Sequence, residues 1–91
     1  MENISESRIF DIYIQDIYGQ KYNIMCIGYQ NTIEYIKNML CYKYLKIDPH
    51  RISLFYKNEK LLDGLSLSDY GIRDGATLQL HIIMQTGFKI R

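Results

Sequence analysis

The two cysteines and two histidines are the side chains of this chain best suited to metal binding or nucleophilic catalysis. Cys26 and Cys41 lack the paired spacing of a zinc site or a redox motif. His50 and His81 lie far apart in the sequence, and no oriented acid is evident beside either, so a cysteine protease has little support. We expect both thiols to be reduced, Cys26 as a small core residue and Cys41 partly exposed on a helix.

Two carboxylates, Asp63 and Asp69, are close enough in sequence to be considered as an acid–base pair. Asp63 precedes Gly64, and Asp69 follows a serine, the contexts in which aspartate usually accepts backbone N–H groups in turns and caps. The chain therefore offers no catalytic constellation. We expect it not to be an enzyme and to need no cofactor or metal.

Length and charge restrict the possible partners. Ninety-one residues allow one domain with one core, and 11 basic against 10 acidic residues leave no charge excess to drive nucleic-acid binding. No apolar run approaches the roughly 20 residues that span a bilayer, and the start lacks the pattern of a secretory signal. We expect a monomeric cytoplasmic or nuclear protein that binds other proteins, without nucleic-acid or membrane partners.

Alternating apolar residues predict a hairpin after a polar leader at residues 1–7, which we expect to be flexible. Residues 10–15 alternate with the period of a half-buried strand, Gly19 supplies a turn, and the alternation resumes over residues 22–26. The residues expected to face inward are Phe10, Ile12, Ile14, Tyr22, Ile24 and Cys26.

The period then changes to that of a helix. Ile33, Ile36 and Leu40 share one helical face, Asn31 or Thr32 is suited to cap the start, and the helix must end before Asp48-Pro49.

Alternation returns in the second half, with strands expected at residues 52–56, 60–61 and 77–83. The residues expected to face inward are Ile52, Leu54, Tyr56, Leu78, Leu80 and Ile82, and those facing outward include Phe55, Gln79, His81 and Ile83. Leu54, Ile36 and Leu80 should share one core.

The stretch from Asp63-Gly64 through Leu67-Ser68-Asp69-Tyr70 to Thr77-Leu78-Gln79-Leu80 resembles the ubiquitin-like family, and the resemblance extends over roughly residues 9–87. It implies an α+β fold of the ubiquitin-like β-grasp type, a curved mixed sheet of four to five strands packed on one helix. It places the domain at residues 8–84 and a flexible tail at residues 85–91. It also implies that the Tyr70 hydroxyl bonds to the loop backbone near the Asp-Gly turn.

The same resemblance implies a partner-binding surface. Ubiquitin binds through an apolar patch on its outer sheet face, and the matching positions here are Ile17, Phe55, Gln79 and His81. The alternation of the strand predicts that Phe55 is an exposed aromatic, and a cluster of exposed apolar residues indicates a partner surface. We expect a non-conjugated interaction domain whose partners are ubiquitin receptors, proteasome subunits or a dedicated protein.

A covalent modifier matured at Gly87 is the alternative function. Gly87 matches the terminal glycine of ubiquitin, but Thr86 replaces the penultimate glycine, and residues 88–91 would have to be cleaved away. A domain that only positions another subunit of an enzyme complex is a third possibility.

Overall fold

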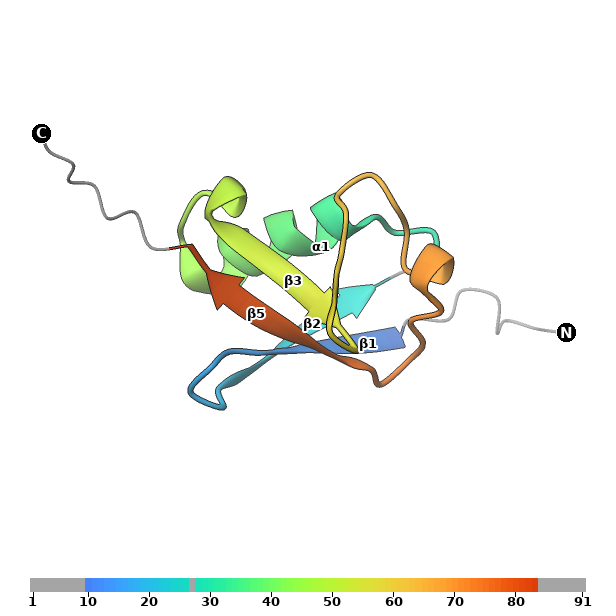
Figure 1. Ribbon diagram of the computed structural model, residues 1–91, viewed down its shortest axis with the longest axis horizontal. Helices are drawn as coiled ribbons and strands as arrows, with labels where there is room; N and C mark the ends of the chain where they lie inside the picture. Colours follow the sequence, from blue (N-terminus) through green and yellow to red (C-terminus); the bar gives the residue numbers. More distant parts are fainter. Residues whose placement is uncertain (1–9, 27, 84–91) are drawn as a thin grey trace, which may run out of the picture.

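Five strands form one mixed sheet in the computed structural model, which describes residues 10–26 and 28–83 (Figure 1). The strands are β1 (Phe10–Gln15), β2 (Lys21–Cys26), β3 (Ile52–Tyr56), β4 (Glu59–Lys60) and β5 (Thr77–Ile82). Their order is β2-β1-β5-β3-β4, with β1 and β5 parallel and the other pairs antiparallel. This arrangement with one helix confirms the ubiquitin-like β-grasp fold class.

The helix α1 (Ile33–Leu40) lies across one face of the sheet. Thr32 is its N-cap, because the Thr32 Oγ1 accepts the N–H of Tyr35 at 3.1 Å. Helical structure continues as a single π-helical turn (Cys41–Leu45) and ends at Lys46, whose φ is 58°. The chain thus leaves the helix before Asp48-Pro49, as the sequence predicted.

The core lies between α1 and the sheet, and no polar or charged residue among those described is buried in it. Leu54 and Ile36 are 0% exposed and Leu80 is 1% exposed, which confirms that the three share one core. The other buried residues are Ile12, Ile14, Ile24, Ile33, Leu40, Cys41, Ile52, Leu61, Leu67, Ile72 and Leu78.

The long loop between β4 and β5 is held by side chains that the sequence singled out. The Tyr70 hydroxyl accepts the N–H of Leu62 at 2.7 Å, and Asp69 Oδ2 accepts the N–H of Ser66 at 2.8 Å. Asp63 pairs with Lys37 of α1, with 2.8 Å between Oδ1 and Nζ. Gly71 closes the 3-10 turn at Ser68–Tyr70 with a φ of 70°, a conformation that glycine adopts without steric cost. These residues therefore tie the loop together.

Some sequence-based expectations about the fold were wrong. Cys41 is buried rather than partly exposed, because it directly follows Leu40 at the end of α1 and lies on the same buried helical face as Ile33 and Leu40. Ile82 is 42% exposed rather than inward, since β1 pairs with β5 only as far as Gln79 and leaves the end of β5 uncovered on that side. The short strand β4 occupies Glu59–Lys60, one residue earlier than expected.

Other expectations fall outside what the structure describes. They are the flexible leader at residues 1–7, the tail at residues 85–91 with Gly87, and the side chains of Phe10 and Cys26. The domain limits of residues 8 and 84 stay predictions.

Candidate protein-binding surface

Strands β3 and β5 place three of the four predicted binding residues on the face of the sheet opposite α1. Phe55 pairs with Gln79 across the two strands, and Ser53 pairs with His81. Phe55 and His81 are therefore diagonal neighbours, a separation that aromatic side chains span easily. The alternation that buries Leu54, Leu78 and Leu80 puts these residues outside.

Phe55 and His81 form a ring contact. Their ring centroids are 4.7 Å apart and the planes are tilted by 41°. As a result Phe55 is half-buried rather than the exposed aromatic that the sequence predicted, whereas His81 and Gln79 remain exposed. The pair thus forms a small, preorganised platform, since each ring limits the motion of the other.

The β1–β2 turn presents the fourth residue, Ile17, with 73% of its surface exposed. Asp16 shapes this turn, because its Oδ1 accepts the N–H groups of Tyr18 and Gln20, each at 2.9 Å. Its Oδ2 also lies 3.4 Å from the Tyr22 hydroxyl. Burial, and then the neighbouring Asp16 carboxylate, raise the pKa of Tyr22, which keeps the phenol protonated as a donor. The turn is held with its apolar tip pointing into solvent.

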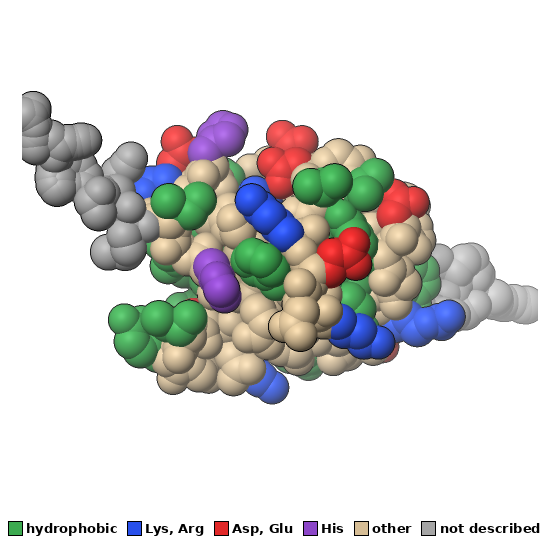
Figure 2. Space-filling view, in the orientation of Figure 1, with side chains coloured by type: hydrophobic (Ala, Val, Ile, Leu, Met, Phe, Trp, Pro, Cys, Tyr) green, Lys and Arg blue, Asp and Glu red, His purple; other side chains and the backbone are tan. Residues whose placement is uncertain are grey.

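A hollow of about 460 Å³ separates this turn from the end of β5. Ile17 and Tyr18 line one side, and His81 and Ile82 line the other. Figure 2 shows the hairpin projecting beside the sheet, with hydrophobic side chains at its tip and a recess between the two. Ile17 and His81 therefore line the same hollow, and the hollow lies between the turn and the Phe55–His81 platform.

Tyr18 and Ile82 belong to this surface although the sequence reasoning did not place them there. Tyr18 is 87% exposed at the turn, and its position beside Gly19 was a sufficient signal for exposure. Ile82 gave no such signal, because strict alternation assigns it to the core. Its exposure follows from where β1 ends, and that is a property of the pairing register.

Among the described residues, the candidate nucleophiles and acids form one contact, between His50 and Asp48. The turn at Pro49 brings His50 Nδ1 within 3.0 Å of Asp48 Oδ1, which corrects the expectation that no acid lies beside a histidine. Cys41 nevertheless has no catalytic environment, because burial, and then the charge of Asp48, raise the pKa of its thiol and keep it protonated. Within residues 10–26 and 28–83 no cluster of three potential metal ligands occurs, and no helix there is long and apolar enough to cross a membrane.

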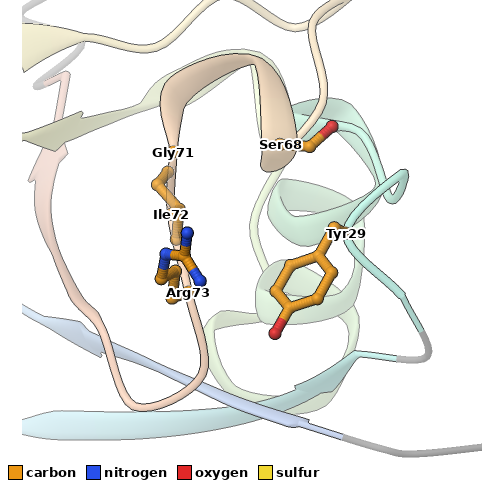
Figure 3. Close-up of a pocket in the computed structure, with 5 residues that line it drawn as sticks. All are labelled: Tyr29, Ser68, Gly71, Ile72 and Arg73. Carbon is orange, nitrogen blue, oxygen red and sulfur yellow. The ribbon is translucent and has the colours of Figure 1, made fainter.

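A second, smaller hollow of about 200 Å³ lies between the segment before α1 and the loop that follows the 3-10 turn (Figure 3). Tyr29 and Arg73 stand on its opposite sides, and Ser68, Gly71 and Ile72 complete the wall. Ser68 has no base among the lining residues that would activate its hydroxyl. This hollow therefore adds no catalytic site to the surface described above.

Comparison with known proteins agrees with the fold. The family model described as the ubiquitin family matches residues 12–85, which is most of the chain. No curated protein matches the chain significantly. The matched length, the mixed five-stranded sheet and the Tyr70 hydroxyl bond to the loop backbone lead to one conclusion. The chain belongs to the ubiquitin family.

Proposed function

We propose that this domain is a non-conjugated, non-enzymatic protein-interaction module that binds its partners through the surface formed by Ile17, Phe55, Gln79 and His81. The observation that carries the proposal is the aromatic platform of Phe55 and His81 beside a hollow with an exposed isoleucine on its far rim. Clustered apolar exposure of this kind is typical of partner surfaces. Ubiquitin receptors, proteasome subunits or a dedicated partner are the proposed ligands, in the cytoplasm or the nucleus.

The shape of the surface suggests how a partner is held. An apolar side chain of the partner would enter the hollow between Ile17 and His81, and a flatter segment would cover the ring of Phe55. A contact limited to these few residues is small, so we expect a dissociation constant on the order of micromolar, which corresponds to a binding free energy of about 8 kcal/mol in magnitude. Aromatic residues near the centre of a small interface usually carry a large share of that energy.

Chemical-shift mapping with isotope-labelled protein and isolated ubiquitin-binding domains of proteasomal receptors tests the proposal. Phe55→Ala should weaken binding about tenfold, corresponding to about 1 to 2 kcal/mol. Tyr13→Ala is the matched control, because Tyr13 is also a half-buried aromatic on the outer face but lies on β1 between Asn23 and Thr77.

Two results would argue against the proposal. Shifts confined to Tyr13 and its neighbours, with normal binding by Phe55→Ala, would move the interface to another part of the sheet. Intact mass spectrometry of the protein from its own cells provides the second test. A species ending at Gly87 and joined to target lysines would instead support the covalent modifier.

A further inference from the structure

The two edges of the sheet differ in length. One edge is β4, which has only two residues, Glu59 and Lys60, both exposed. The other edge is β2, with six residues. Short and charged edge strands resist pairing with other chains, whereas a six-residue edge offers a template for strand addition. The β2 edge is therefore the one that requires protection.

The hairpin register identifies the backbone groups that β2 presents to its outer side. Asp16 donates its N–H to the carbonyl of Gln20, so the alternation of an antiparallel ladder directs Tyr22 and Ile24 toward β1. Lys21, Asn23 and Met25 then direct their N–H and C=O groups away from β1. Asn23 lies in the middle of this row.

Tyr44 covers the centre of the row. Its hydroxyl donates to the backbone carbonyl of Asn23 at 3.0 Å, although the two residues are in different elements. Its ring packs against that of Tyr22, with 5.2 Å between the centroids and 52° between the planes. The Tyr44 hydroxyl thus occupies the Asn23 carbonyl, which an added strand would need as an acceptor for its own N–H group. The Tyr44 ring also packs on the side chain of the neighbouring residue, Tyr22.

The π-helical turn (Cys41–Leu45) holds Tyr44 in place. Lys46 donates its N–H to the carbonyl of Cys41 at 2.7 Å, and its φ of 58° ends the helix there. A π turn contains one more residue than an α turn, so it rotates the side chains that follow relative to a regular helix. Cys41 is buried and anchors the turn, and Lys43 Nζ lies 5.5 Å from the Tyr44 ring centroid.

We propose that Tyr44 is an edge cap, a device that keeps the β2 strand of one copy from pairing with the β2 strand of a second copy. A second copy is the relevant competitor because it carries the same six-residue edge at the same concentration. The cap lies on the β2 edge, whereas Phe55, Gln79 and His81 of the proposed binding surface belong to β3 and β5, which are separated from β2 by β1. The inference does not depend on the proposed function.

Light scattering after size exclusion, together with amide exchange, tests the cap. Wild-type protein should stay monomeric from about 10 µM to about 1 mM, whereas Tyr44→Ala should approach twice the monomer mass at the higher concentration. Over the same range the amides of Asn23 and Met25 in this variant should exchange about tenfold more slowly, because an added strand protects them. Tyr42→Ala is the control, since Tyr42 lies in the same π turn, is 76% exposed and should leave the protein monomeric.

Two further variants assign any association to the edge. Tyr44→Phe keeps the ring and removes only the hydroxyl, so it should also associate, about tenfold more weakly than Tyr44→Ala. Asn23→Pro added to Tyr44→Ala removes an outward N–H and should restore the monomer. A folded, monomeric Tyr44→Ala, or association that survives Asn23→Pro, would overturn the proposal. If Tyr44→Ala does not fold, a monomeric Tyr44→Phe at about 1 mM decides against it.

Discussion

Truncation of Leu54 is the most direct test of the strand phase on which the binding surface depends. Leu54 is 0% exposed at the centre of β3, opposite Leu80. Leu54→Ala removes three side-chain carbons, each contributing about 0.8 kcal/mol when buried, or about 2.4 kcal/mol in total. The cavity left behind raises the expected loss in the free energy of unfolding to about 3 to 5 kcal/mol. This would be a large part of the stability of a small domain.

Urea unfolding followed by circular dichroism measures this loss. With a slope of about 1 to 1.5 kcal/mol per molar urea, the midpoint should fall by roughly 2 to 5 M. Ile36→Val is a milder variant in the same core and should cost about 0.5 to 1.5 kcal/mol, which keeps the comparison measurable if Leu54→Ala is largely unfolded. Phe55→Ala should cost only about 1 kcal/mol, because the side chain is half-buried. A loss in the free energy of unfolding below about 1 kcal/mol for Leu54→Ala would show that the assigned inward and outward faces of β3 are wrong. A loss for Phe55→Ala that exceeds the loss for Leu54→Ala would show the same.

Three further predictions concern groups outside the binding surface. Tyr70→Phe should lower the free energy of unfolding by about 0.5 to 1.5 kcal/mol, measured in urea, because the N–H of Leu62 loses its acceptor. The backbone N–H and then the side chain of His50 lower the pKa of Asp48, so the stability from this carboxylate is present above about pH 4 and is lost as the pH falls through the folded-state pKa. Thermal melts should accordingly show Asp48→Asn to be destabilising at pH 7, with a difference from wild type that shrinks as the pH falls through the folded-state pKa. Peptide mapping should show that iodoacetamide modifies Cys41 at least about tenfold more slowly in the folded protein than in denaturant, and equal rates would contradict its burial.

Local patterns in the sequence were sufficient for most of the fold. Alternation identified β1, β2, β3 and β5, and helical spacing identified α1, because each element buries one face and exposes the other. The Asp-Gly turn and the segment around Tyr70 depend on nearby backbone groups, so their roles were also predictable. The family resemblance supplied the fold class, a mixed sheet packed on one helix, which periodicity alone does not specify.

Errors arose where a residue's environment depends on distant elements. Ile82 has the alternation of a core residue, yet β1 pairs with β5 only to Gln79 and leaves it uncovered. By contrast, Cys41 packs against the sheet in the core, and helical spacing from Ile33 places it on the buried face, so the expectation of partial exposure overlooked that spacing. Phe55 is outward as predicted, but the ring of His81, far along the chain, makes it half-buried.

The sequence by itself determined which side of each strand is apolar, where the turns fall and which residues face outward over most of the sheet, since these properties depend on neighbours within a few positions. The tertiary structure decided which outward residues meet. Pairing of β3 with β5 brings Phe55 to His81, and the shaped turn at Asp16 places Ile17 across the hollow. The π turn likewise brings Tyr44 to the carbonyl of Asn23. Each of these contacts joins segments far apart in the sequence, so it depends on how the strands pair and on where the helical turn ends, which are set by the packing of the whole domain.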